Sequence, residues 1–206
     1  MIQAGASKMA DSFRFTYSLG PASVARLRSM PSEQLRQAVL VDGEDALTGV
    51  LDVVVNGKRV FELSEEGYRR LVADSKSGLT SEASRTGLNG ACIMDWFLAV
   101  LLAVRTIGKG ASRHEFDLAH HGFWFRFRSQ GDRLFLTVEL GEGAHPISAF
   151  LVTRIDDEIL ALDDLRTETA SKTGMFLREI EPLNPGLARH RDVLEAKSLL
   201  AQVLRT

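Results

Sequence analysis

The chain has 206 residues, of which 45% are hydrophobic, 25% are charged and 7% are aromatic. This composition is typical of an ordinary globular domain and argues against a disordered, collagen-like or coiled-coil chain. The formal net charge of −2 argues against a broad nucleic-acid-binding surface, and the single cysteine excludes an intramolecular disulfide or a multi-cysteine metal centre.

The N-terminal region predicts a tail followed by a strand. Residues 1–11 are small and polar, so we expect a flexible tail. Aromatic and polar residues then alternate from Phe13 to Leu19, which predicts a strand with one buried face. Short helical segments are expected over residues 24–28 and 32–39.

Residues 50–63 predict a β-hairpin. The pair Asn56-Gly57 lies between two β-branched runs and suits a type I′ turn, which places Val53 opposite Val60. Ser64 is the expected N-cap of a helix that follows.

Residues 74–90 lack an apolar period, so we expect a long loop or an internal linker there. The next segment, from Ala91 to Ile107, is apolar on nearly every side. It predicts a helix enclosed by its neighbours, and it is too short to cross a membrane.

Further strands are predicted after this helix, over residues 113–118, 123–128 and 133–140. The last two should form a hairpin around Gln130-Gly131, in which Phe127 faces Leu134 and Phe125 faces Leu136. The aromatic face of this hairpin is expected to pack on the apolar helix.

The C-terminal part predicts one strand and two helices. The strand is expected over residues 147–155, and Asp156 is the expected cap of a helix carrying Ile159 and Leu165. After a Pro-rich break at 182–186, a last amphipathic helix follows.

These elements indicate an α+β fold, in which a mostly antiparallel sheet of hairpins packs on a central apolar helix with covering helices. We expect one domain over residues 12–206, with a candidate internal linker at 74–90.

One set of residues suggests covalent catalysis. Cys92 lies at the expected N-terminus of the apolar helix, where the helix dipole would lower the pKa of its thiol. His120 and His121 precede a strand, and Glu139 ends the next one. This order resembles transglutaminase-like and papain-like cysteine enzymes. The resemblance implies a hydrolase or acyltransferase with Cys92 as nucleophile, His121 or His120 as base and Glu139 as the orienting acid.

The alternative is that Cys92 is a small buried residue and that the two histidines lie in a polar turn, and we favour it. A second cluster contains candidate metal ligands: His114, Glu115, Asp117, His120 and His121. On a strand His114 and Asp117 point to opposite faces, so we predict neither a metal nor another cofactor. Acidic residues at 156–158 and 163–164 are expected on a solvated helix face.

Trp124, Arg126 and Arg128 alternate with the buried phenylalanines, so they occupy the other face of their strand. Tryptophan and arginine are enriched in protein interfaces. We therefore predict a non-enzymatic, cytoplasmic protein-binding module, similar in type to small bacterial antitoxin or immunity proteins. Its expected partner is another protein, rather than a nucleic acid or a membrane.

Overall fold

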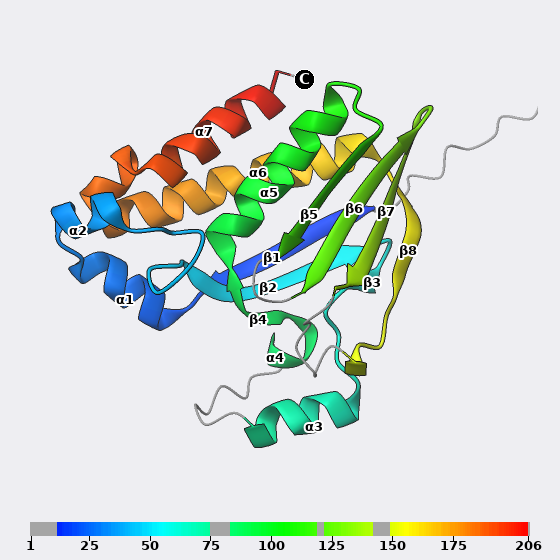
Figure 1. Cartoon of the computed structure of the whole chain (residues 1–206), viewed down its shortest axis with the longest axis horizontal. Coiled ribbons are helices and arrows are strands. Elements are labelled where there is room, and N and C mark those ends of the chain that lie inside the picture. Colours follow the sequence, from blue (N-terminus) through cyan, green and yellow to red (C-terminus); the bar gives the residue numbers. More distant parts are fainter. Residues whose placement is uncertain (1–11, 75–82, 119–121, 142–148, 206) are drawn as a thin grey trace, which may run out of the picture.

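The computed structural model describes residues 12–74, 83–118, 122–141 and 149–205 (Figure 1). Two antiparallel four-stranded sheets pack with helices, which confirms the predicted α+β class. The strands are β1 (Phe13–Leu19), β2 (Thr48–Val55), β3 (Lys58–Arg59), β4 (Leu88–Cys92), β5 (Arg113–Leu118), β6 (Phe123–Gln130), β7 (Arg133–Leu140) and β8 (Ile155–Leu160). The α-helices are α1 (Pro21–Ser29), α2 (Ser32–Gln37), α3 (Glu65–Asp74), α4 (Ala83–Thr86), α5 (Ile93–Gly108), α6 (Leu162–Ile180) and α7 (Arg191–Val203).

The first sheet is built around β2. Strand β1 pairs along one side of β2, whereas β3 and β4 pair with opposite ends of its other side. The second sheet has the order β5-β6-β7-β8. In Figure 1 the strands of the second sheet cross in front of β1 and β2.

The hairpin of β2 and β3 confirms the prediction from Asn56-Gly57. Both residues have positive φ, 48° and 80°, as a type I′ turn requires. The amide of Val60 donates to the carbonyl of Val53 at 2.8 Å, so these residues are opposite each other as expected. The N-cap is also confirmed, because the hydroxyl of Ser64 accepts from the amide of Gly67 at 3.2 Å.

Helix α5 is the central element of the core. The fully buried Trp96 lies 5.4 Å from Phe15 of the first sheet and 5.3 Å from Phe125 of the second, measured between ring centroids. Phe97 stacks on Phe176 of α6 at 4.4 Å. One side of α5 is nevertheless open to solvent, since Leu102 is 39% exposed, so the predicted complete enclosure of this helix is wrong.

The boundary before α5 also differs from the prediction. Ala91 and Cys92 belong to β4, and the helix begins at Ile93. The described part of the predicted loop at 74–90 contains α4 and the first residues of β4, because pairing with β2 orders a segment that has no apolar period. The expected tail at 1–11 lies outside the described residues.

The predicted register of the β6-β7 hairpin is wrong by two residues. Phe127 faces Leu136 and Phe125 faces Val138, because Gln130 and Arg133 form the last pair and the turn is Gly131-Asp132. Gly131 adopts the positive φ of 63°, which glycine accepts without strain. A shift of two residues keeps the same side chains on the same face, so the aromatic face still packs on α5.

The chain between β7 and α6 was also assigned incorrectly from sequence. A strand was expected to end at Ile155, but β8 begins there. Asp156 therefore lies in a strand and caps no helix, and α6 begins at Leu162 without a side-chain cap. Pairing with β7 decides this, since a strand edge can satisfy the backbone of residues whose local preference is for a helix start.

Helix α6 protects the free edge of β1. The carboxylate of Asp164 accepts from the amide of Ser12 at 2.9 Å and from its hydroxyl at 2.8 Å. Glu168 accepts from the amide of Phe15 at 3.0 Å. The expected solvated role of Asp164 is thus wrong, because this carboxylate satisfies an edge strand that would otherwise present unpaired amides.

We expect Asp164→Ala to lower the free energy of unfolding by about 1–3 kcal/mol, because it leaves the amide and hydroxyl of Ser12 without their acceptor. Urea denaturation measures this change. Asp163→Ala is the matched control, since that neighbouring side chain is 87% exposed. Equal stabilities of the two variants would contradict the role given to Asp164.

Candidate functional site

The outer face of the second sheet contains the residues predicted to bind a partner. Phe123, Phe125 and Phe127 are buried against the core. Their neighbours along β6 alternate to the other face, where solvent reaches them in part. We define this outer face by the following residues of β5 to β8: Glu115, Trp124, Arg126, Arg128, Phe135, Thr137, Glu139, Asp157 and Ile159.

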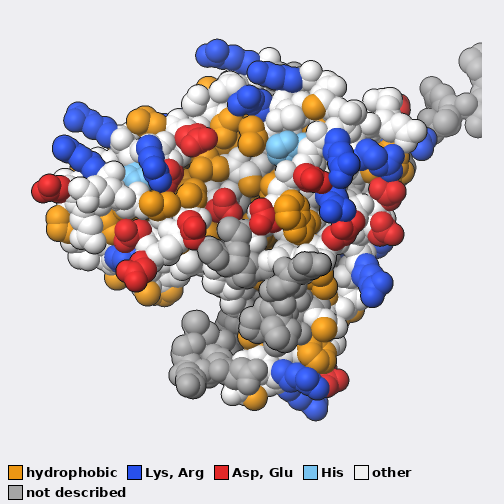
Figure 2. Space-filling view, in the orientation of Figure 1, with side chains coloured by type: hydrophobic (Ala, Val, Ile, Leu, Met, Phe, Trp, Pro, Cys, Tyr) orange, Lys and Arg blue, Asp and Glu red, His pale blue; other side chains and the backbone are white. Residues whose placement is uncertain are grey.

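Ion pairs connect β5, β6 and β7 across the outer face. Arg126 of β6 contacts Glu139 of β7 at 2.6 Å and Glu115 of β5 at 3.4 Å. Arg113 contacts the same Glu115 at 3.0 Å. Figure 2 shows acidic and basic side chains intermixed over β5 to β8. The outer face therefore presents both signs of charge at fixed positions.

Arg128 is held by an aromatic ring and a carboxylate. Its guanidinium carbon lies 4.5 Å from the centroid of the Phe135 ring, and one nitrogen lies 3.1 Å from Asp157. Asp157 has a φ of 47° at an irregularity in the β7-β8 pairing, and its amide donates to the hydroxyl of Thr137 at 3.0 Å. A β-bulge of this kind re-aims a side chain, and here it directs Asp157 toward Arg128.

Trp124 rests on the backbone of the chain beyond β7. A Cβ atom on Gly141 would lie 2.7 Å from the indole nitrogen of Trp124, so a larger residue at this position would displace the ring. The amide of Gly141 donates to the carbonyl of Gly122 at 2.7 Å, which fixes the backbone beneath the ring. Trp124 is thereby half-buried with one side of the ring covered.

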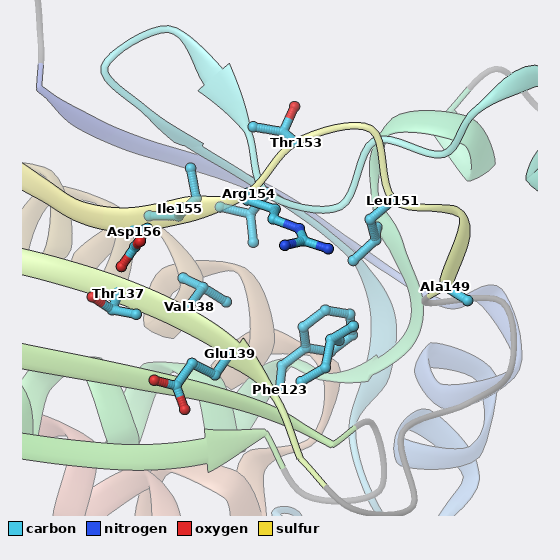
Figure 3. Close-up of a pocket in the computed structure, with 12 residues that line it drawn as sticks. Phe123, Thr137, Val138, Glu139, Ala149, Leu151, Thr153, Arg154, Ile155 and Asp156 are labelled. Atoms are coloured by element: carbon cyan, nitrogen blue, oxygen red, sulfur yellow. The ribbon is translucent and has the colours of Figure 1, made fainter.

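A cavity of about 540 Å³ lies where β7 and the chain before β8 separate (Figure 3). The pairing of β7 with β8 ends at Val138 and Ile155. Beyond this pair, residues 149–154 diverge from the end of β7 and leave a space between them. The sequence did not predict this cavity, because no local pattern indicates where two paired strands separate.

Cys92 is a buried residue of the core and the N-cap of α5. Its thiol donates to the carbonyl of Leu40 at 3.2 Å. Backbone amides at the start of α5 favour the thiolate, but burial outweighs them and raises the pKa of Cys92 to about 11. The predicted lowering of this pKa is therefore wrong. The free-energy cost of removing a thiolate from water exceeds its stabilisation by the helix N-terminus.

Glu139 is the one described partner of Cys92 in the predicted catalytic triad, and it belongs to the outer face. Glu139 contacts Arg126 on the outer face, and His120 and His121 lie outside the described residues. A different histidine, His190, is buried at the start of α7. Its two ring nitrogens form hydrogen bonds with the carbonyl of Ala38 and the amide of Asp192, both at 3.2 Å. His190 thus has a structural role that occupies both nitrogens.

The candidate metal ligands do not converge in the described part of the chain. His114 is opposite Phe127 on the inner face, where burial lowers its pKa, whereas Glu115 and Asp117 belong to the outer face. Among the described residues no group of three His, Cys, Asp or Glu side chains could hold a metal ion.

Comparison with known proteins gives no match: no family model, no curated protein and no solved structure resembles the chain. Within the described ranges, every helix is too short or too polar to cross a membrane.

We expect Cys92 to react with iodoacetamide at neutral pH about 100-fold more slowly in the folded protein than in the unfolded protein. A pKa raised from 9 to about 11 lowers the thiolate fraction by this factor. Mass spectrometry after labelling with and without urea measures the two rates. Rapid stoichiometric labelling of the folded protein would contradict the burial of a protonated thiol.

The same pKa predicts a pH dependence of stability. Between about pH 9 and 11 the unfolded thiol loses its proton while the folded thiol retains it, so the free energy of unfolding falls as the pH rises. The expected loss is about 2–3 kcal/mol once both states are ionised. The free energies of unfolding of the wild type and of Cys92→Ala, taken from denaturation curves, should converge over this range, because the variant lacks the titrating thiol. If the two free energies changed with pH in parallel, the Cys92 thiol would have the same pKa in the folded and unfolded states, which would contradict the prediction.

Proposed function

We propose that the protein is a non-enzymatic protein-binding module whose interface is the outer face of the second sheet. One observation supports this most directly: within the described residues no helix covers this face, although it contains Trp124, Phe135 and Ile159. Ile159 is 42% exposed, and the two aromatic rings are half-buried. Aromatic and arginine side chains on an accessible sheet face are the residue types that dominate interface energies.

The contacts among the outer-face residues support binding more than stability. Exposed ion pairs such as Arg126–Glu139 contribute little to folding, about 0–1 kcal/mol. They do restrict the arginine side chains, and Phe135 and Asp157 restrict Arg128 in the same way. Side chains that are already ordered lose less entropy on association, so the face is preorganised for a partner.

The intermixed charges favour a protein partner. A nucleic-acid surface needs unpaired cations in rows, whereas Arg113, Arg126 and Arg128 each have a carboxylate partner. A protein partner can match both signs of charge and cover the aromatic rings. By analogy of type with antitoxin and immunity proteins, we infer a cytoplasmic protein. The buried, protonated Cys92 gives no support to the alternative of a cysteine hydrolase or acyltransferase.

The double variant R126E/R128E tests the proposed interface. We expect it to weaken partner binding at least tenfold, because it reverses two charges that lie at the centre of the face. Affinity capture from the native cell with quantitative mass spectrometry identifies the partner, and calorimetry with the purified partner measures the affinity. The wild type and R126E/R128E must show the same circular dichroism spectrum.

The matched control is R69E/R70E. It makes the same change in charge on α3, where both arginines are exposed and also form ion pairs with glutamates. The proposal requires that the control retain the partner. Retention by R126E/R128E, or equal loss by both variants, would show that the outer face is not the interface.

A further inference from the structure

The cavity beside β7 has a mixed lining, in which apolar side chains lie next to polar and charged ones. The walls include the following apolar side chains: Val60, Phe123, Val138, Leu140, Leu151 and Ile155. Val60, Phe123 and Ile155 are otherwise buried, so the cavity reaches the edge of the core. A volume of about 540 Å³ lies within the range of small-molecule sites. This volume is large enough for the apolar body of a small ligand.

Among the described residues that line the cavity, Arg154 is the one cation. Arg154 extends from the segment before β8, and Figure 3 shows its guanidinium directed into the space between Val138, Leu151 and Phe123. In the described ranges no carboxylate forms an ion pair with Arg154, in contrast to Arg126 and Arg128. Its five donors are therefore available to a ligand.

The acidic residues of the cavity are directed elsewhere. The carboxylate of Glu139 points away from the cavity and contacts Arg126 on the outer face. That of Asp156 points toward Thr137 and away from the guanidinium of Arg154. The hydroxyl of Thr137 already bonds the amide of Asp157, and the hydroxyl of Thr153 also points away. Among the described side chains of the cavity, the polar end of a ligand would thus meet the guanidinium alone.

We propose that this cavity binds a small molecule with one carboxylate and an apolar body, and that Arg154 contacts the carboxylate. A planar guanidinium matches the two oxygens of a carboxylate in a bidentate pair. A single arginine balances one negative charge, which favours a carboxylate over a doubly charged phosphate. The apolar walls supply the remaining affinity through burial of the ligand body.

Octanoate is a suitable probe, and 1-octanol is its neutral counterpart of equal chain length. Titration of the ¹⁵N-labelled full chain, followed by two-dimensional NMR, should give saturable octanoate shifts at Val138, Leu151 and Ile155. We expect R154Q to weaken octanoate binding about tenfold or more, because it removes a charge-assisted hydrogen bond. Octanol should bind more weakly than octanoate, and equally to wild type and R154Q.

Two further variants keep the test specific. R133Q is the matched control, because Arg133 is exposed at the opposite end of β7 and lies outside the cavity, and it should bind octanoate as the wild type does. L140W should abolish binding of both probes by filling the cavity, and Leu140 is 48% exposed, so the fold should tolerate the change.

Several results would overturn the proposal. They are the absence of saturable octanoate shifts at the cavity, an equal affinity of R154Q and wild type for octanoate, and tighter binding of octanol than of octanoate. Binding of a peptide with a free C-terminal leucine, but of neither octanoate nor the amidated peptide, would assign the cavity to a partner's C-terminus instead. The result is independent of the proposed interface, because R154Q leaves Arg126 and Arg128 unchanged.

Discussion

The packing of Trp96 between the two sheets is the interaction on which the rest of the structure depends. Its indole contacts Phe15 of the first sheet and both Phe116 and Phe125 of the second, with centroid distances of 5.3–5.9 Å. Edge-to-face pairs of this kind each contribute about 0.5–1.5 kcal/mol beyond their burial. Because α5 joins the sheets through this residue, the inner face of the second sheet is fixed, and its outer face must turn toward solvent.

The alternation of β6 links the core to the proposed interface. From Phe123 to Phe127 every second residue is a phenylalanine that packs inward, and Trp124, Arg126 and Arg128 face outward. The same strand therefore stabilises the fold and positions the outer face. The cavity with Arg154 lies at the border of this face, where β7 and β8 separate, so the two proposed sites share a scaffold but differ in chemistry.

Cys92 illustrates a competition between two local effects. Its place at the N-terminus of α5 was correctly predicted, and the amides of that terminus do favour the thiolate. Burial in the core opposes them and prevails, because the field of a helix end is small beside the loss of hydration of a thiolate. The position of a residue along a helix is thus a poor guide to its pKa unless its burial is known.

The sequence by itself determined the faces of the most regular strands and the β2-β3 hairpin, since alternation and turn residues such as Asn56-Gly57 act over a few neighbours. It did not determine the element type of residues 156–160 or of the segment before α5. The tertiary structure decided the rest. The β6-β7 register could not be chosen, because a two-residue shift preserves the alternation. Asp164 finds its partner Ser12 at a separation of 152 residues, and the cavity of Arg154 exists only where two strands part. Contacts between residues distant in sequence depend on the packed arrangement of the whole chain, which no local pattern encodes.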